Sequence, residues 1–442
     1  MIKVVKFGGS SLASATQIKK AKNILYSDDT RKYCIASASG KRDKDDEKIT
    51  DLLINLHKNI NNDIVAKEIY NKIKDRYIKI VEELNITYDI EKELDYIFKK
   101  AKTENLDFVA SRGEYLTAKI LSIYCNEPFL DMQNVIIFND DKKVNYDLTY
   151  ANIKKEIENI EKINANAKII IPGFYGSNIN GDIITFSRGG SDITGSLVAR
   201  ALNANLYENW TDVSGVLFVD PRIVENPKVV EYISYTELRE LSYMGANVLH
   251  EEAVYPVSKV GIPINILNTN VPTDKGTMIV SNIPSIIKRN AVTGIAGKKG
   301  FTSILIQKAL MNEEIGYLAK LLNIFDNEKI SVEHCPTGID TVSVIVRTDF
   351  LNDKKDKIIN TIKKELSPDV LSVEDNMAII AIVGEGMKYS NVITKNIFNI
   401  LADKLIPIKM IDQGSSGINI IIGIGDNDYE KALAALSELQ NL

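Results

Sequence analysis

The chain has 442 residues, of which 45% are hydrophobic and 26% charged, a composition typical of globular domains that excludes collagen-like, low-complexity and largely disordered proteins. The formal net charge of -5 argues against a dedicated nucleic-acid-binding protein, and no run of about 18 uncharged apolar residues predicts a membrane span. Three dispersed cysteines, three dispersed histidines and a glycine already at position 8 predict a cytoplasmic protein without a disulfide framework, zinc site or signal peptide.

The first 60 residues alternate short apolar runs with helical patterns. Ile2–Phe7 is predicted to be a buried strand, and Gly8-Gly9-Ser10-Ser11 follows it before an amphipathic stretch that extends to Leu25. A second predicted strand, Tyr33–Ser37, again ends in small residues. This order of strand, glycine-rich turn, helix and strand is typical of a parallel α/β sheet. Apolar residues at helical spacing over 63–107 then predict a helical insertion.

The sheet pattern returns after this insertion. Lys168–Ile171 is predicted to be a strand, and Asn180-Gly181 marks a hairpin before the strand Ile183–Phe186. Residues 187–192 open a helix that extends to about Ala204. Prolines and glycines interrupt residues 256–284, so we expect the first domain to end near Pro284.

The remaining residues contain a repeated pattern. Residues 302–374 predict the order βαββαβ, and residues 378–439 predict βαββα. The second unit therefore lacks its last strand. The segment Ala291–Ala296 is apolar enough to supply it, which predicts that the two units interleave.

Four polar motifs fall where predicted strands lead into helices. Each has a plain structural explanation when taken alone, namely a turn, a helix cap or an acidic residue at a helix start. Open α/β sheets bind ligands at such places, so the four together predict one site. The Walker A spacing and the protein-kinase motifs are absent from the sequence. The motifs are KFGGSS (6–11), SRGE (111–114), SRGGSD (187–192) and WTDV (210–213) with DPR (220–222).

These motifs closely resemble those of the aspartate kinases of the amino acid kinase family, and the paired C-terminal units resemble ACT domains. The resemblance extends over essentially the whole chain. It implies an α/β amino acid kinase fold over 1–284, an open and mainly parallel sheet sandwiched by helices, with the helical insertion at about 50–107. Two βαββαβ ACT domains at 301–376 and 377–442 would follow, the second completed by the strand 291–296.

The resemblance also implies an activity, which is transfer of the ATP γ-phosphate to the side-chain carboxylate of L-aspartate. This reaction is the first step of lysine, threonine and methionine biosynthesis. Mg²⁺ would be held mainly by ATP oxygens and water, so no residue is assigned as a metal ligand. Lys6 would contact the transferred phosphate, and Asp192 would organise Lys6. The nucleotide would also be bound by Phe7, Gly8, Gly9, Ser10, Thr211, Asp212, Asp220 and Arg222, and aspartate by Thr50, Glu114, Arg188, Gly189, Gly190 and Ser191.

An effector site in the first ACT unit is implied as well. Feedback inhibition by L-lysine, or alternatively threonine, and a homodimer or homotetramer formed through the ACT domains are expected. Glu333 stands where the family commonly has an aspartate, and its charge favours lysine. The effector residues would be Met311, Gly316, Tyr317, Leu318, Ser331, Val332 and Glu333.

Two positions depart from the family pattern and leave alternatives open. Leu217 stands where many members have a tyrosine near the adenine, and Asn247 stands where many have a lysine. A non-catalytic amino-acid sensor is one alternative, and a kinase acting on glutamate, N-acetylglutamate or UMP is another. The paired ACT-like units and the SRGE motif argue against the second. A chain ending at residue 442 leaves no room for a fused homoserine dehydrogenase.

Overall fold

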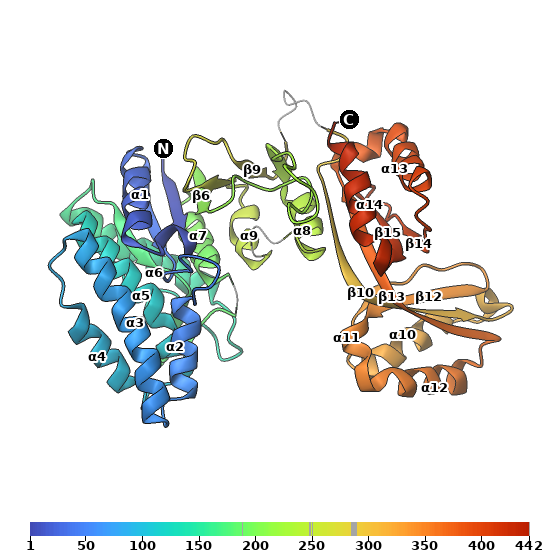
Figure 1. The fold of residues 1–442 in the computed structure, drawn as a ribbon, viewed down its shortest axis with the longest axis horizontal. Helices are drawn as coiled ribbons and strands as arrows, with labels where there is room; N and C mark the ends of the chain where they lie inside the picture. The colour runs from blue at the N-terminus through green and yellow to red at the C-terminus, as the bar shows by residue number, and fades with distance from the viewer. Residues whose placement is uncertain (188, 247–248, 250, 284–289, 442) are drawn as a thin grey trace. The chain divides into compact units, whose positions relative to one another are not determined.

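A computed structural model describes residues 1–187, 189–246, 249, 251–283 and 290–441. The chain packs into two compact units, which are coloured along the sequence in Figure 1. The first unit comprises Met1–Val216, Val229–Tyr235 and the described residues within Val248–Pro284. The second comprises Leu217–Lys228, the described residues within Thr236–Asn247, and the described residues within Ser285–Leu442.

The first unit is built on a seven-stranded sheet of order β3-β2-β1-β6-β8-β9-β7. Its first five strands are mutually parallel, so their carboxyl ends lie at one edge of the sheet, whereas β9 runs antiparallel to β8. A separate hairpin of β4 (Tyr175–Ser177) and β5 (Ile183–Thr185) forms at the predicted Asn-Gly turn. The sheet strands are β1 (Lys3–Phe7), β2 (Arg31–Ala36), β3 (Ile169–Pro172), β6 (Leu206–Thr211), β7 (Tyr232–Ser234), β8 (Ile264–Asn268) and β9 (Thr277–Val280).

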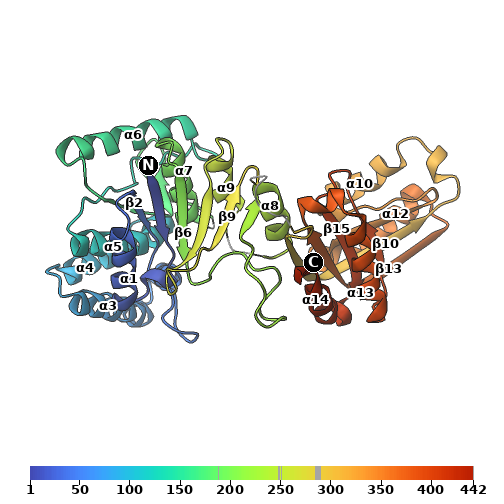
Figure 2. The same ribbon diagram turned by 90° about the horizontal axis from the view of Figure 1, so that it is seen from above.

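Alternation along the strands assigns side chains to two faces of this sheet. Val5 and Phe7 belong to an apolar core with helices α1–α5, so Lys6 projects to the opposite face, which α7 covers. Figure 2 shows α1, α3, α4 and α5 together on one side of β1, with α7 and α9 on the other. The helices are α1 (Ala15–Tyr26), α2 (Ile49–Lys58), α3 (Asp63–Leu84), α4 (Ile90–Lys100), α5 (Leu106–Cys125), α6 (Tyr146–Ile163), α7 (Gly190–Ala201) and α9 (Glu251–Ser258).

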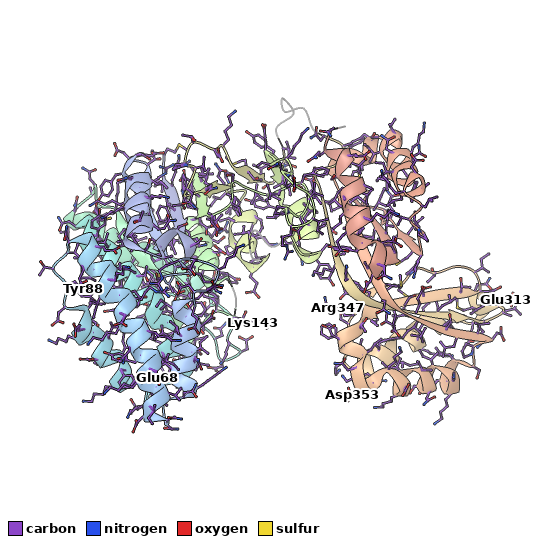
Figure 3. All side chains as sticks on the ribbon, in the orientation of Figure 1. Glu68, Tyr88, Lys143, Glu313, Arg347 and Asp353 are labelled. Carbon is purple, nitrogen blue, oxygen red and sulfur yellow. The ribbon has the colours of Figure 1, made fainter. Side chains whose placement is uncertain are left out.

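Short polar side chains begin most of these helices. Ser14, Asn62, Asp89 and Asn105 each accept a backbone N–H of the first turn, which satisfies a donor that the helix leaves unpaired. Charged residues such as Glu68 on α3 remain exposed, whereas the apolar stripe of each helix is buried (Figure 3).

The second unit contains a six-stranded antiparallel sheet of order β11-β12-β10-β13-β15-β14. Helices α10 (Tyr317–Asn327) and α12 (Lys355–Leu366) pack on one apolar core. Helices α13 (Asn391–Asp403) and α14 (Tyr429–Leu436) pack on another. The strands are β10 (Gly294–Gln307), β11 (Val332–His334), β12 (Thr341–Arg347), β13 (Val370–Val383), β14 (Met410–Asp412) and β15 (Asn419–Gly425), and a short helix, α11 (Thr348–Leu351), follows β12.

The two repeated units predicted at 302–374 and 378–439 share central strands of this one sheet. Of the segment expected at 291–296, residues 294–296 begin the 14-residue strand β10, and Gly294 pairs with Val383 of β13. The sequence pattern separates this segment from the strand at 302–307 because Gly300 lies between them. In the structure, the chain passes Gly300 with φ at +87° and a shift in register, so one strand serves both halves.

Two segments from the expected first domain pack in the second unit instead. Residues 217–228 contribute Phe218, whose carbonyl accepts the Ile295 amide at 2.7 Å. Helix α8 (Tyr235–Tyr243) contributes Glu237, whose carboxylate accepts the Thr293 hydroxyl at 2.7 Å. The compact units therefore do not follow the contiguous division at 284. Long-range packing of this kind leaves no local signal in the sequence.

Candidate active site

The turn after β1 lies at the carboxyl edge of the parallel strands. The Gly8 amide donates to the Trp210 carbonyl at 2.9 Å, and the Gly40 amide donates to the Gly9 carbonyl at 2.9 Å. A Cβ atom on Gly40 would lie 2.5 Å from the Gly9 carbonyl carbon, so this close approach of two loops requires glycine at position 40. The turn containing Gly8, Gly9 and Ser10 is thus fixed by its neighbours, with a helix start behind it.

Lys6 and Asp192 form a buried ion pair beside this turn. Lys6 is 8% exposed, and its Nζ lies 2.7 Å from Asp192 Oδ1. Asn209, on the neighbouring strand β6, donates its amide to the same oxygen at 2.9 Å and accepts from Lys6 Nζ at 3.4 Å. Phe7 projects to the other face, into the apolar core. The sequence analysis did not select Asn209. A polar residue inside the buried segment LYENWT could have indicated a functional side chain.

The loop before α7 is held against the end of β3. Gly189, at φ +60°, precedes the helix, and Gly190 has no room for a side chain because its Cβ would lie 2.6 Å from the Phe174 ring. Ser191 is buried against Gly173. Phe174 has φ at +78°, an uncommon conformation for an aromatic residue, and its amide donates to Thr194 at 3.1 Å. Sequence reasoning missed Phe174 as well. The predicted residue Arg188 lies outside the described residues.

Glu114 is a buried carboxyl group on α5. It is 5% exposed, and its Oε2 has no hydrogen-bond partner among the described residues. Burial raises its pKa from 4.5 to about 8, although backbone hydrogen bonds from Ala38 and Glu114 itself and the charge of Arg112 act in the opposite direction. A buried carboxyl group without a hydrogen-bond partner lowers the stability of the fold unless a ligand supplies that partner. Glu114 is therefore suited to bind a cationic ligand group such as an ammonium.

The helical insertion supports the walls of this site. Tyr77 on α3 donates its hydroxyl to the Gly113 carbonyl at 3.0 Å, directly before Glu114. The neighbouring Arg76 donates to the Gly40 carbonyl at 3.0 Å and pairs with Asp46 at 2.5 Å. The insertion thus holds both the loop after β2 and the helix that carries Glu114. Thr50 lies half-buried in the first turn of α2.

The four remaining residues predicted to bind the nucleotide divide between the two units. Thr211 ends β6 and donates to exposed Asp212 at 3.2 Å, and both belong to the first unit. Asp220 and Arg222 belong to the second unit, where they pair with each other at 2.5 Å. The hydrogen bond from Arg222 lowers the pKa of Asp220 below its usual value. Leu217 is half-buried in the second unit, and Asn247 lies outside the described residues.

The predicted effector residues gather around the start of α10 and the strand β11. Gly316 precedes α10 with φ at +82°, and the Tyr317 hydroxyl is buried without a hydrogen-bond partner among the described residues. Glu333 accepts a hydrogen bond from Tyr243 at the end of α8, a contact that sequence reasoning missed. Of the others, Met311 is buried, Val332 is half-buried, and Leu318 and Ser331 are exposed.

No group of three or more His, Cys, Asp or Glu side chains in the described part of the chain is arranged to hold a metal ion. No described helix is long and apolar enough to cross a membrane.

Comparison with known proteins agrees with this geometry. The model of the amino acid kinase family matches residues 1–268, and that of the ACT domain matches residues 380–440. Aspartokinase 3 of Bacillus subtilis is 38% identical over 449 residues, covering 98% of both chains. Lysine-sensitive aspartokinase 3 of Escherichia coli is 26% identical, also covering 98% of both chains.

Solved structures extend the similarity to three dimensions. The aspartate kinase of Clostridium acetobutylicum, described as an allosteric enzyme, is 48% identical with a TM-score of 0.88 over 100% of both chains. Escherichia coli aspartokinase III in complex with aspartate and ADP is 25% identical with a TM-score of 0.76 over 99% of both chains. The predicted mainly parallel α/β fold with a C-terminal ACT domain is confirmed.

Proposed function

Because the chain belongs to the amino acid kinase family, and within it to the aspartate kinases, we propose that it transfers the ATP γ-phosphate to the side-chain carboxylate of L-aspartate. The product would be 4-phospho-L-aspartate, and the reaction would begin lysine, threonine and methionine biosynthesis in the cytoplasm. The observation that carries this proposal is the Lys6–Asp192–Asn209 cluster at the carboxyl edge of the sheet, beside the glycine turn.

This cluster suits phosphoryl transfer. The reaction needs positioning and charge neutralisation more than covalent help from the protein. Lys6 supplies a buried positive charge, and Asp192 and Asn209 fix its direction. Gly8, Gly9 and Ser10 would bind phosphate oxygens at the helix start, with the Gly9 and Ser10 amides as donors, because the Gly8 amide already donates to the Trp210 carbonyl. When bound, Mg²⁺ would neutralise phosphate charge and would be held mainly by nucleotide oxygens and water, so no residue is assigned as its ligand.

Aspartate and the adenosine moiety would bind on either side of the transferred phosphate. The unsatisfied Glu114 carboxyl group would hold the substrate ammonium. Arg188 would hold its α-carboxylate, and Thr50 and the Gly189–Ser191 loop would complete the aspartate site. Thr211 and Asp212, which belong to the first unit, would bind the nucleotide. The relative in complex with aspartate and ADP supports this choice of ligands.

An assay of ADP release tests the proposed function. Purified protein with Mg-ATP is expected to release ADP when L-aspartate is added, and to show little release with L-glutamate, N-acetylglutamate or UMP. A hydroxylamine trap should detect the acyl phosphate. ADP release with another acceptor would reassign the substrate, and binding of an amino acid without ADP release would indicate a sensor.

The C-terminal part is proposed to regulate the enzyme as a pair of ACT domains at 301–376 and 377–442. They would follow a catalytic domain at 1–284, from which residues 217–228 and the described residues within 236–247 pack in the second unit. Leu318 and Leu322 form an exposed apolar stripe on α10, and Ile315, which precedes the helix, is 96% exposed. Such a stripe favours a homodimer contact, and two dimers could form a homotetramer. The effector would bind beside this stripe, at Gly316 and Glu333.

Lysine inhibition is the prediction that tests this regulatory site. Millimolar L-lysine is expected to inhibit the enzyme, because Glu333 offers a carboxylate to a cationic side chain, and threonine is the alternative effector. Both Glu333→Gln and Ser331→Ala should raise the lysine concentration for half-inhibition by about tenfold or more, as loss of a charged hydrogen bond would. The lysine-sensitive relative supports this choice of effector.

A control in the same half of the second unit is available. Glu328 pairs with Lys357 at 2.7 Å and follows the last residue of α10, at the end of the helix opposite Gly316, so Glu328→Gln should keep the parental sensitivity. Inhibition requires that lysine bind the less active state more tightly than the active one. If neither lysine nor threonine changes the rate, the regulatory proposal fails and the kinase proposal stands.

A further inference from the structure

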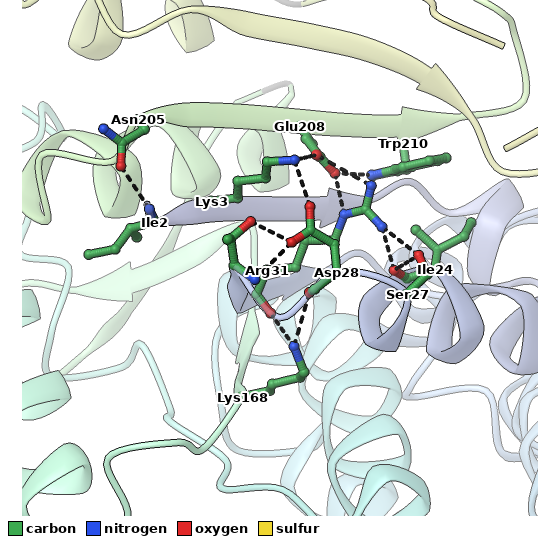
Figure 4. Close-up of polar contacts among 11 residues, drawn as sticks. Ile2, Lys3, Ile24, Ser27, Asp28, Arg31, Lys168, Asn205, Glu208 and Trp210 are labelled. Carbon is green, nitrogen blue, oxygen red and sulfur yellow. Dashed lines mark hydrogen bonds and ion pairs between the residues drawn. The ribbon is translucent and has the colours of Figure 1, made fainter. Parts of the chain in front are cut away.

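A cluster of charged residues centred on the buried Glu208 carboxylate lies on the face of β6 opposite the Lys6–Asp192 pair (Figure 4). The Glu208 carboxylate, which is 2% exposed, accepts hydrogen bonds from Arg31 Nε at 2.8 Å and from Trp210 Nε1 at 2.9 Å. It also lies 3.1 Å from Lys3 Nζ, which pairs with Asp28 at 2.7 Å. Two cations and two carboxylates thus balance one another. Because buried charges persist only when paired and hydrogen-bonded, these side chains hold one another in place.

Trp210 connects this cluster to the turn after β1. Its indole N–H is held by Glu208, and its ring lies 5.2 Å from the Arg31 guanidinium carbon. Its backbone carbonyl accepts the Gly8 amide at 2.9 Å and the Ser11 hydroxyl at 3.5 Å. The residue that Glu208 fixes through its side chain is therefore the one whose carbonyl sets the position of the turn.

The same segment of β6 presents Asn209 to the reacting groups. Side chains alternate along a strand, so Glu208 and Trp210 project to one face and Asn209 to the other. Asn209 donates to Asp192 at 2.9 Å. Anchoring the strand through Glu208 and Trp210 therefore also fixes the direction of the Asn209 amide.

Arg31 extends the cluster to the helix that follows the turn. Its Nη1 donates to the Ile24 carbonyl at 2.6 Å and to the Ser27 hydroxyl at 2.8 Å, at the end of α1 (Figure 4). The Gly8–Ser11 turn thus lies between β6 and α1 in the chain's packing. The Glu208 carboxylate contacts β6 through Trp210 and α1 through Arg31.

We propose that Glu208 is a positioning residue for phosphoryl transfer, which holds the Gly8–Ser11 turn through Trp210 and Arg31 and touches no substrate. This inference rests on the proposed function, because the ligand of the turn is ATP only if the chain is an ATP-dependent kinase. Phosphoryl transfer depends on the alignment of the reacting groups, so a small displacement of the turn lowers the rate while the fold remains.

Glu208→Gln tests this proposal, because it keeps the size of the side chain and removes its charge. We expect kcat to fall by about tenfold or more, as misplacement of reacting groups does. The Kd for ATP, measured by calorimetry, should rise, and the KM for aspartate should stay within about twofold of the parent. Trp210 is the only tryptophan, so a shifted emission maximum reports directly that its surroundings have changed.

Two further variants separate positioning from general stability. Asp28→Asn removes the other carboxylate of the cluster, which has no contact with Trp210, so it should lower Tm and leave kcat within about twofold of the parent. Trp210→Phe keeps the backbone carbonyl that accepts the Gly8 amide and removes the indole N–H that donates to Glu208. It should lower kcat and weaken ATP binding, and it continues the test if Glu208→Gln does not fold.

Three outcomes decide the proposal. Parental kcat and ATP affinity in Glu208→Gln, together with a shifted Trp210 emission, would overturn it. An equal loss of kcat in Asp28→Asn would also overturn it, because the effect would then follow stability alone. If the parent binds ATP in calorimetry but releases no ADP with aspartate, the proposed function fails, and a parental ATP affinity in Glu208→Gln would then overturn the positioning role of Glu208.

Discussion

Lys6→Ala is expected to lower kcat by about 10²–10³ while the protein remains folded, because loss of one preorganised electrostatic contact to a transition state has an effect of this size. Lys6 is the buried cation at the end of β1, and Asp192 and Asn209 fix it beside the glycine turn. Its charge would meet the transferred phosphate. Steady-state kinetics with aspartate and Mg-ATP measure the effect, and thermal unfolding checks the fold.

Two further variants distinguish a loss of catalysis from a loss of stability. Removing Lys6 leaves the Asp192 carboxylate without its cation, which can destabilise the protein. Lys6→Ala/Asp192→Asn removes both charges, and we expect it to regain stability but not turnover. Lys32→Ala on the neighbouring strand β2 is the control, since its ammonium group donates only to the Ala165 carbonyl among the described residues. Near-parental turnover in a folded Lys6→Ala protein would remove Lys6 from the catalytic residues.

Glu114→Gln is expected to damage the use of aspartate far more than the binding of ATP. The change keeps the side-chain shape and removes the negative charge that would hold the substrate ammonium. Loss of one partner of a buried charge pair costs about 2–5 kcal/mol, or roughly 30-fold to several thousand-fold in kcat/KM for aspartate. Arg188→Ala, at a position outside the described residues, is expected to act on aspartate in the same direction.

The pH dependence gives Glu114 a second signature. With a pKa of about 8, Glu114 is mostly protonated in the free enzyme at neutral pH. The KM for aspartate should therefore fall as pH rises from about 7 to 9 and Glu114 ionises, until the substrate amine loses its own proton. For the empty enzyme, the free energy of unfolding should decrease between the ordinary carboxyl pKa of 4.5 and about 8, because the folded protein retains a proton that the unfolded chain has released.

Controls for Glu114 use a second glutamate near the same helix. Glu127 comes after the last residue of α5, whereas Glu114 lies near the middle of that helix. Glu127 accepts the Tyr26 hydroxyl at 2.7 Å and the Lys168 amide at 3.0 Å. Glu127→Gln should lower stability and leave the pH profile of KM unchanged. Two results for Glu114→Gln would show that Glu114 does not hold the ammonium. One is an ATP affinity that falls as far as the aspartate affinity, and the other is a pH dependence of the aspartate KM that is the same as in the parent.

Local patterns in the sequence predicted much of the fold. A strand such as Ile2–Phe7 followed by two glycines, or the apolar spacing of α3 and α4, is encoded within a dozen residues by burial and backbone freedom. Counting strands in the C-terminal repeats also indicated that residues 291–296 would complete the second unit, and Gly294–Lys299 do pair with the end of β13. The motif residues Lys6, Glu114 and Asp192 were selected in the same way.

The tertiary structure alone decided how these residues meet. Lys6 and Asn209 are 203 positions apart, and only the parallel pairing of β1 with β6 places them together beside Asp192. Helix α3 was predicted as an insertion, yet its Arg76 and Tyr77 support the loops around Glu114 through contacts more than 30 residues away. Residues 217–228 belong to the second unit, because the core there buries Phe218 and Val219. Pairings across such separations depend on the closure of long loops and on the shape of the whole core, which no local window of sequence contains.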